Sequence, residues 1–429
     1  MSGAFRKRKN PLYILSSILI ILVVAALIGG AAVIAAVVLI ILVLFYPVFQ
    51  IFWVKLYGLE DIADQVFHAH TDDGWNIAMH FHRPRYPKKG AYPVIFSHGI
   101  AVNKFGVDLD RAHSLAYFLK QNGYPVFVLS LRGVGKSYHS SRYGYRDFSF
   151  DDIVEYDVAA VIRKAKELTG SPKVNWVGHS MGGMIMYGFL GRKIAGHEDV
   201  ASFTAIGSPG RLDHARTSIW GAISKYPWMS QMLDLKFGAQ VVSPITGRFI
   251  TPIEELVYNK EVVSSTTIRR LMKNGVENIA PGLSIQFTDW IKSGKEYTKD
   301  GSFNYRDSFK EIKIPSLFLA GARDHIAIRE SVRFAFENTG SKIKELKIMG
   351  QEGGFPVDYC HTGLVLGDRA PLDIFPQVLE WLDTYGCEKK KMFFISKIVQ
   401  KIKARGKKKK AAKVRTYHED VVRGGVISS

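Results

Sequence analysis

The feature that most constrains the fold is a G-x-S-x-G motif, Gly178–Gly182, with Ser180 at its centre. A β-rich apolar run, residues 174–177, precedes it, and an apolar run typical of a buried helix, residues 184–190, follows it. A serine in such a strand–turn–helix context adopts a strained backbone that exposes its hydroxyl at a sheet edge. Glycines at both motif ends allow close approach of strand and helix. The pattern predicts that Ser180 is a nucleophile; the alternative is a glycine-rich turn with an incidental serine.

Strands and helices alternate along the chain from residue 93 to residue 207, and the alternation resumes at residue 314. Short runs rich in β-branched and aromatic residues, bounded by glycine or proline, indicate the strands, and amphipathic periodicity indicates the helices. Such alternation is typical of a mostly parallel sheet covered by helices. The expected strands are 93–97, 125–129, 201–207, 314–321 and 345–349, and the expected helices are 111–122, 151–169 and 373–385.

Residues 211–312 break this alternation. They are helical in pattern and rich in aromatic residues, among them Trp220, Trp228 and Trp290. An insertion at this place predicts a helical cap over the carboxyl edge of the sheet, with its aromatic side chains lining an apolar substrate site. The alternative is additional helical packing without a role in substrate binding.

The N-terminal part predicts a membrane segment. No charged side chain occurs between Pro11 and Val54, and residues 12–46 are almost entirely apolar. This run is too long for the apolar core of a cleaved signal peptide. As one helix it would span about 52 Å, against roughly 30 Å of bilayer hydrocarbon. Either one tilted helix or a hairpin broken at Gly29-Gly30 fits; we expect the hairpin, which places the following domain in the cytoplasm.

The positive charge of the chain is concentrated at its ends. The formal net charge is +19, of which the basic residues 6–9 contribute +4 and residues 388–429 contribute +11. The remainder is close to balance, so no nucleic-acid partner is expected. The tail interleaves basic residues with apolar ones, which suits an anionic lipid surface. The expected organisation is a basic N-terminus (1–10), a membrane segment (11–54), a domain (60–387) with its cap, and a basic tail (388–429).

No metal or cofactor is expected. Two cysteines, Cys360 and Cys387, make neither a disulfide framework nor a metal cluster. Four histidines alternate along a predicted hairpin around Asp73-Gly74, namely His68, His70, His80 and His82. We interpret them as polar faces of edge strands rather than metal ligands. The stretch from Arg132 to Ser137 resembles a phosphate loop but lacks its spacing.

A nucleophilic serine requires a histidine to accept its proton and a carboxylate to orient that histidine. Where the serine lies in such a strand–turn–helix elbow, the three residues follow one another along the chain in the order serine, acid, histidine. Asp324 follows a predicted strand and turn, where the acid is expected. His361 lies in a loop after the predicted final strand and is the expected base, in preference to His325, which adjoins the acid, and His418, in the tail.

Two backbone amides are expected to stabilise a tetrahedral oxyanion. One is Met181, the residue after the nucleophile, and the other is Ile100, in the loop after the first core strand. Gly99 permits a close approach of this loop, and His98 is expected to be structural. Cys360, beside the predicted base, is interpreted as part of the loop rather than a second nucleophile.

These motifs resemble the α/β-hydrolase superfamily, and within it the branch of acid (gastric and lysosomal) lipases. The resemblance rests on His70–Trp75 with His82-Arg83, on Ser97-His98-Gly99, on Asn122–Val126 and on Leu131-Arg132-Gly133. It continues through Phe148–Asp152 and Tyr156-Asp157 to the serine motif. Arg369-Ala370-Pro371 and Trp381-Leu382 look more like polyhydroxyalkanoate synthase relatives, which use cysteine where this chain has Ser180. The lipases typically have Gln where this chain has Met181; the donor there is backbone.

The resemblance implies an α/β-hydrolase fold and a serine hydrolase that cleaves carboxylic esters, with a lipid-like ester as substrate. The apolar N-terminal run predicts that this hydrolase is anchored in a membrane. Two rival functions share these sequence features. An acyltransferase would use the same triad and pass the acyl group to an alcohol. A non-catalytic binding protein would keep the scaffold without an activated serine.

Overall fold

The computed structural model describes residues 34–41, 44–45, 52, 56–142, 146–213, 234–248, 255 and 257–388. The chain divides into two units, Met1–Gly58 and Leu59–Ser429. In the first unit, residues 34–41 are helical. Within the described ranges, no helix combines the length and the apolar character that crossing a bilayer requires. Most of the predicted membrane segment and the tail from residue 389 lie outside the described residues.

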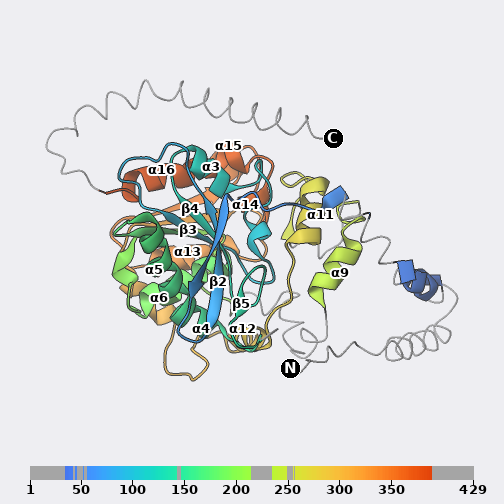
Figure 1. Ribbon diagram of the computed structural model, residues 1–429, viewed down its shortest axis with the longest axis horizontal. Coiled ribbons are helices and arrows are strands. Elements are labelled where there is room, and N and C mark those ends of the chain that lie inside the picture. The colour runs from blue at the N-terminus through green and yellow to red at the C-terminus, as the bar shows by residue number, and fades with distance from the viewer. Residues whose placement is uncertain are drawn as a thin grey trace, which may run out of the picture. The chain divides into compact units, whose positions relative to one another are not determined.

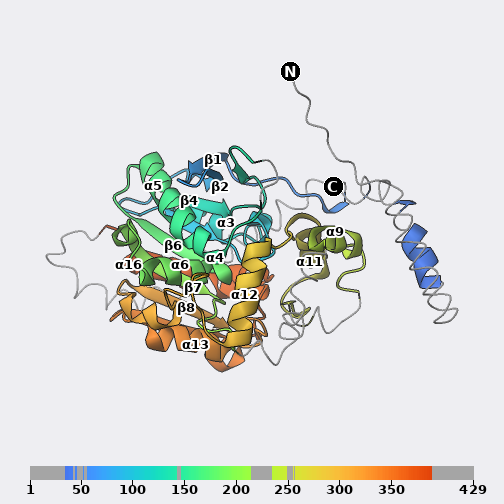
Figure 2. The ribbon, with the colours of Figure 1, turned by 90° about the horizontal axis from the view of Figure 1, so that it is seen from below.

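The described residues of the second unit form one nine-stranded sheet in the order β1-β2-β4-β3-β6-β7-β8-β9, with β5 paired to β2 (Figure 2). The pairs β1–β2 and β2–β4 are antiparallel, and every neighbouring pair from β4 to β9 is parallel. The mostly parallel sheet predicted from the alternation is therefore confirmed. The strands are β1 (Gln65–His70), β2 (Trp75–His82), β3 (Val94–Ser97), β4 (Val126–Ser130), β5 (Tyr138–His139), β6 (Val174–His179), β7 (Val200–Ile206), β8 (Ser316–Gly321) and β9 (Lys344–Met349).

Helices cover both faces of the sheet because its central strands are apolar on both faces. In β3, for example, Ile95 packs into one core, and Val94 and Phe96 pack into the other. The first core also takes residues of α5, α6 and α13, and the second takes residues of α3, α15 and α16 (Figure 1). The helices are α3 (Leu115–Gln121), α4 (Phe150–Asp152), α5 (Val158–Thr169), α6 (Met181–Gly191), α9 (Leu235–Val242), α11 (Ser265–Asn274), α12 (Pro281–Ser293), α13 (Arg329–Asn338), α14 (Gly363–Leu366), α15 (Ala370–Asp373) and α16 (Phe375–Tyr385).

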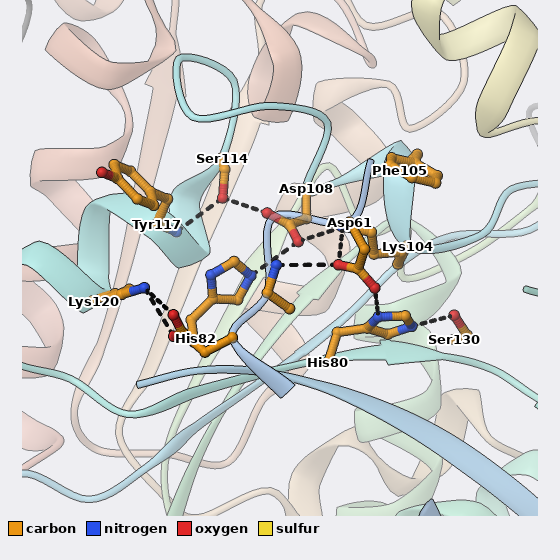
Figure 3. A network of polar contacts seen from close by, with 12 residues as sticks. Asp61, His80, His82, Lys104, Phe105, Asp108, Ser114, Tyr117, Lys120 and Ser130 are labelled. Atoms are coloured by element: carbon orange, nitrogen blue, oxygen red, sulfur yellow. Dashed lines mark hydrogen bonds and ion pairs between the residues drawn. The ribbon is translucent and has the colours of Figure 1, made fainter. Parts of the chain in front are cut away.

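The histidines of the predicted hairpin do not all lie on polar edge faces, which corrects the interpretation made from the sequence. Strand β2 lies between β1 and β4, so His80 and His82 are buried, 2% and 0% exposed. His80 Nδ1 bonds Asp61 Oδ2 at 2.5 Å, and His82 Nε2 bonds Asp108 Oδ2 at 3.0 Å (Figure 3). Buried polar side chains require such partners. These carboxylates come from distant loops, which is why no spacing in the sequence reveals them.

The segment that resembled a phosphate loop begins with Arg132, which makes buried ion pairs within the domain. The Arg132 guanidinium is buried and bonds Asp73 Oδ2 at 2.7 Å and Asp157 Oδ1 at 2.6 Å. It thereby joins the turn of the β1–β2 hairpin to a π-helical turn, Ile153–Asp157, that precedes α5. Because the Arg132 guanidinium already pairs with two carboxylates, we assign it a structural role and not the binding of an anion.

The described part of the predicted cap divides into two groups of helices. Helices α9 and α11 pack against each other, and both views show them side by side (Figures 1 and 2). Helix α12 instead packs against α4, and its Leu283 and Trp290 belong to the core that contains α5 and α6. Trp220 and Trp228 lie outside the described residues.

His113 ties α11 to the body of the domain. Its Nδ1 bonds Asp110 at 2.9 Å and its Nε2 bonds Asp368 at 3.1 Å, and Thr267 of α11 lies 3.3 Å from the same Nε2. Burial alone would lower the pKa of His113, but the hydrogen bonds to the two carboxylates raise that pKa to about 9. The imidazolium is therefore the form that the folded protein favours at neutral pH.

Trp290 is a packing residue in this structure. It is 3% exposed, stacks edge-on against Phe150 and Tyr305, and donates its indole N–H to the Tyr297 carbonyl at 2.7 Å.

We expect Trp290→Ala to lower the free energy of unfolding by about 3–5 kcal/mol, because it removes a large buried ring and leaves a cavity. Urea unfolding measures this. Tyr86→Ala, at a ring 76% exposed, is the control and should change stability by less than about 1 kcal/mol. A matching small effect at Trp290 would favour the substrate-lining role expected from the sequence.

Candidate active site

The G-x-S-x-G motif forms a strained elbow between β6 and α6. Ser180 has φ 56° and ψ −126°, a backbone conformation that residues other than glycine rarely adopt. A Cβ on Gly178 would lie 2.4 Å from the Gly182 carbonyl carbon, and a Cβ on Gly182 would lie 2.3 Å from Ser97 O. Only glycine fits either position. The strand, turn and helix predicted around the motif are therefore confirmed.

Asp324 and His361 meet as predicted, in loops that follow β8 and β9. His361 Nδ1–H donates to Asp324 Oδ2 at 2.8 Å, and both side chains are buried. The other oxygen, Oδ1, accepts from the Ile326 and Ala327 amides at 2.9 and 2.8 Å. The carboxylate is thus fixed by its own turn. Because the Asp324 carboxylate accepts the proton on Nδ1, the lone pair of the neutral His361 ring lies on Nε2.

The loop of His361 lies directly beside the serine elbow. His179, the residue before Ser180, donates from Nε2 to the His361 carbonyl at 3.2 Å, and the two rings are 4.6 Å apart. Within the described part of the chain, the Ser180 hydroxyl makes no hydrogen bond with another residue. Catalytic hydrogen bonds are often long before substrate binds. The structure therefore brings the three predicted residues to one sheet edge and forms the acid–histidine contact.

The predicted oxyanion donors also lie at the serine. A Cβ on Gly99 would come within 2.8 Å of Ser180 Cβ and 3.2 Å of its Oγ, so the loop after β3 touches the nucleophile. The amide of Ile100, in that loop, donates to no other residue in the described ranges. Met181 is the first residue of α6, where backbone amides have no partner within the helix.

Two further buried histidines, His98 and His179, flank the serine elbow. His98 is buried, donates from Nδ1 to the Gly99 carbonyl at 2.8 Å and accepts at Nε2 from the Leu131 amide at 3.1 Å. Burial lowers the pKa of His98 to about 4. His179 is likewise buried, and burial followed by the neighbouring His361 holds the pKa of His179 well below its usual value. His98 has the structural part expected from the sequence, whereas His179 was missed because the second position of the motif carries no pattern of its own.

Other candidate side chains are not placed for catalysis. His325 is exposed to solvent, whereas the neighbouring Asp324 is buried. Cys360 is buried, accepts from the Asn259 amide at Sγ, and burial raises the pKa of its thiol to about 11. A thiol of this kind is a poor nucleophile. His418 lies outside the described residues.

Neither of two hollows in the described part of the domain is lined by Ser180, Asp324 or His361. A cavity of about 20 Å³ lies beside α6, lined by aromatic side chains that include Tyr187, Trp290 and Tyr305 and by Met184. A larger groove of about 900 Å³ lies along α13 and β9, and its charged lining contains none of the predicted site residues. In the described ranges, no group of three or more His, Cys, Asp or Glu side chains is arranged to hold a metal ion.

The buried and charged histidines predict how stability depends on pH. His98 resists protonation in the folded state, so its contribution is present above pH 6.5 and is lost as pH falls toward 4. His113 favours protonation, so its contribution is present below pH 6.5 and is lost as pH rises through about 9. We expect the free energy of unfolding to be greatest near pH 6–7, with limbs of up to about 1.4 kcal/mol per pH unit for each group.

Urea unfolding between pH 4 and pH 9.5 measures these limbs. His113→Gln should flatten the alkaline limb and leave the acid limb in place, whereas the same change at the exposed His70 should alter neither. An unchanged alkaline limb in His113→Gln would show that this histidine is not the titrating group.

Known proteins share the fold of this chain. Residues 92–339 match the family model described as alpha/beta hydrolase fold. The chain belongs to the alpha/beta hydrolase fold family. The esterase of Thermogutta terrifontis shares this hydrolase fold at 16% identity, with a TM-score of 0.50 over 75% of this chain and 99% of that one.

Two lipases are among the curated proteins that this hydrolase-fold chain resembles. Lipase 1 of Drosophila melanogaster is 31% identical over 159 residues, which cover 36% of this chain and 35% of that protein. Gastric triacylglycerol lipase of Mus musculus is 32% identical over 133 residues, which cover 28% and 32%. The chain thus matches about a third of the length of each, and the similarity to acid lipases is distant.

Proposed function

We propose that this protein is a serine hydrolase that cleaves carboxylic esters through an acyl-serine intermediate. The observation that carries the proposal is the buried Asp324–His361 hydrogen bond beside a strained elbow that presents Ser180. A serine hydroxyl needs this arrangement to attack a carbonyl at neutral pH. A protein that only binds ligands on this scaffold has no use for the strain or for the buried carboxylate.

In the proposed reaction each step is carried by one of these groups. His361 Nε2 accepts the Ser180 proton as Oγ bonds the ester carbonyl carbon, and the carbonyl oxygen becomes an oxyanion held by the Ile100 and Met181 amides. The C–O bond to the alcohol then breaks, and His361 returns the proton to the departing alkoxide. Water, activated by the same histidine, releases the acid and restores the serine.

We propose a lipid-like ester as the substrate. The support is the distant similarity to acid lipases, including one whose name specifies triacylglycerol as its substrate. The similarity of the C-terminal motifs to polyhydroxyalkanoate synthase relatives stays a prediction, and Ser180 in place of their cysteine favours hydrolysis.

Purified protein should be assayed with p-nitrophenyl esters of graded chain length and, separately, with a medium-chain ester in the presence of a primary alcohol. The proposal expects hydrolysis of the panel and free acid as the main product. A new ester as the main product would establish acyl transfer by the same triad. Failure to turn over any ester, with the fold intact, would favour a binding protein.

We further propose that the uncharged run up to residue 54 is a membrane hairpin, that the hydrolase domain is cytoplasmic, and that the basic tail lies on anionic lipid. The support is sequence alone: two legs of near-bilayer length around Gly29-Gly30 and positive charges on both flanks. Fusion of a cytoplasm-active and of an export-active reporter after residue 60 decides this. Signal only from the first is expected, and signal only from the second would place the domain outside.

A further inference from the structure

The loop that carries Ile100 is attached to the cap by backbone pairing. The Glu277 amide donates to the Ala101 carbonyl at 2.9 Å, the Asn103 amide donates to the Gly275 carbonyl at 2.8 Å, and Val102 pairs with Val276 between them. Residues 275–277 connect α11 to α12. A short antiparallel ribbon therefore joins the segment next to the predicted oxyanion donor to the insertion that follows β7.

The Asn103 side chain fastens this ribbon. It is 5% exposed, and its amide nitrogen donates to Glu277 Oε1 at 2.8 Å and to the Asn274 carbonyl at 2.9 Å. Its oxygen accepts from the Phe105 amide at 3.0 Å. The Glu277 carboxylate, 5% exposed, also receives Lys236 Nζ from α9 at 3.0 Å. Every hydrogen-bonding group of Asn103 is thus committed to holding the loop.

The far end of the same loop is fixed by a buried ion-pair network (Figure 3). Lys104 is 2% exposed and lies between Asp61, at 2.8 Å, and Asp108, at 3.0 Å. These carboxylates are held in turn by His80 and His82 of β2. Asp108 also accepts from Ser114, the cap residue of α3, at 2.5 Å. The loop therefore cannot shift at this end without breaking buried ion pairs.

Between these anchors the backbone is strained. Ala101, directly after Ile100, has φ 61°. A residue with a Cβ keeps such a conformation only where the surrounding structure imposes it. The orientation of the Ile100 peptide, and hence the direction of its N–H, depends on this torsion and on the contacts that enforce it.

We propose that Asn103 and Glu277 are positioning residues that hold the Ile100 amide in the oxyanion hole, so that the cap sets transition-state stabilisation as well as substrate fit. The inference rests on the proposed function of Ser180 and Ile100. An oxyanion donor acts only within a few tenths of an ångström of its ideal place, and losing one costs about 10²–10³ in turnover. Loosening its loop is expected to cost part of that.

The test compares the full-length variants Asn103→Ala, Glu277→Ala and Glu277→Gln on a p-nitrophenyl ester. The two alanine variants should lower kcat by about 10- to 100-fold and leave KM within about threefold. Glu277→Gln keeps an oxygen for Asn103 and should stay within about threefold of the wild type. Asn338→Ala, which removes an exposed amide bonded to Phe334 O in α13, is the matched control and should change nothing.

A trifluoromethyl ketone inhibitor separates positioning from general structure. Ser180 Oγ adds to its carbonyl carbon, and the resulting oxyanion occupies the hole. Its inhibition constant should rise in proportion to the loss of kcat/KM, because both measure binding of an oxyanion. The inhibition constant of an unreactive ether analogue with the same chain should stay unchanged, since it places no charge there.

Wild-type kcat and ketone affinity in both alanine variants would overturn the inference, as would equal losses of ketone and ether binding. Should Asn103→Ala fail to fold, the two Glu277 variants decide alone, because they leave the other Asn103 contacts in place. An inactive wild-type protein that also fails to react with the ketone would instead overturn the proposed function.

Discussion

Replacing Ser180 with alanine is expected to abolish ester hydrolysis, by up to about 10⁶ in turnover. The strained turn at this residue serves to present one hydroxyl, and no other nucleophile stands beside His361 in the described residues: the Cys360 thiol is buried and its pKa is raised to about 11. Initial rates on a p-nitrophenyl ester, with the folded state checked by circular dichroism, measure the effect.

The control for this substitution is Ser302→Ala, which removes an exposed hydroxyl from a loop of the insertion and should keep the wild-type rate. Wild-type turnover in folded Ser180→Ala would contradict the mechanism, whatever the behaviour of the other variants. Loss of activity in both variants would point to an artefact of preparation and would require repeating the assay with refolded protein.

Replacing His361 with alanine should reduce turnover about as much as the loss of the serine, because His361 is the proposed acceptor of the Oγ proton. Asp324→Asn should cost about 10⁴ in turnover. The asparagine amide would donate to His361 Nδ1, which places the ring proton on Nε2, where it blocks acceptance of the serine proton. Its remaining oxygen could still accept from the Ile326 and Ala327 amides, so the turn should keep its shape.

His325→Ala is the matched control for this pair, because His325 adjoins the acid in sequence but is exposed. It should keep full activity. Full activity in His361→Ala, or a loss in His325→Ala as large as that in His361→Ala, would contradict the proposal that His361 is the base.

The strained turn at Ser180 and the positions of Asp324 and His361 could be predicted from the sequence because each depends on local rules. Gly178 and Gly182 flank Ser180 at fixed spacing, and Asp324 follows a strand and a turn whose apolar run is easily recognised. Parallel strands bring their carboxyl ends to one edge, so residues that follow β6, β8 and β9 meet there. The contact between Asp324 and His361 follows from that topology.

The contacts that depend on distant loops could not be predicted. His80 and His82 alternate like exposed polar residues, but their partners Asp61 and Asp108 lie in loops outside the hairpin, 19 and 26 positions away. The aromatic content of the insertion predicted that Trp290 lines a substrate site, whereas in the structure Trp290 packs against Phe150. In both cases tertiary packing, which no local pattern encodes, decides whether a side chain faces solvent, substrate or core.

The short ribbon that joins residues 101–103 to residues 275–277 could not be predicted from the sequence either. Asn103 and Glu277 are unremarkable in the sequence and belong to no motif, yet they bond each other across 174 positions. The role proposed for them is suggested by the left-handed conformation of the neighbouring Ala101. Side chains that position a catalytic backbone amide leave no trace in a single sequence, because the amide itself requires no particular residue type.

The central claim is that Ser180 is an activated nucleophile, and covalent labelling tests it most directly. Full-length protein treated with a fluorophosphonate should gain the mass of one adduct, and peptide mapping should place that adduct on Ser180. Labelling should vanish in Ser180→Ala and slow greatly in His361→Ala, because reaction requires deprotonation of the hydroxyl. Folded wild-type protein that fails to label, or that labels equally fast after the serine has been replaced, would contradict the account.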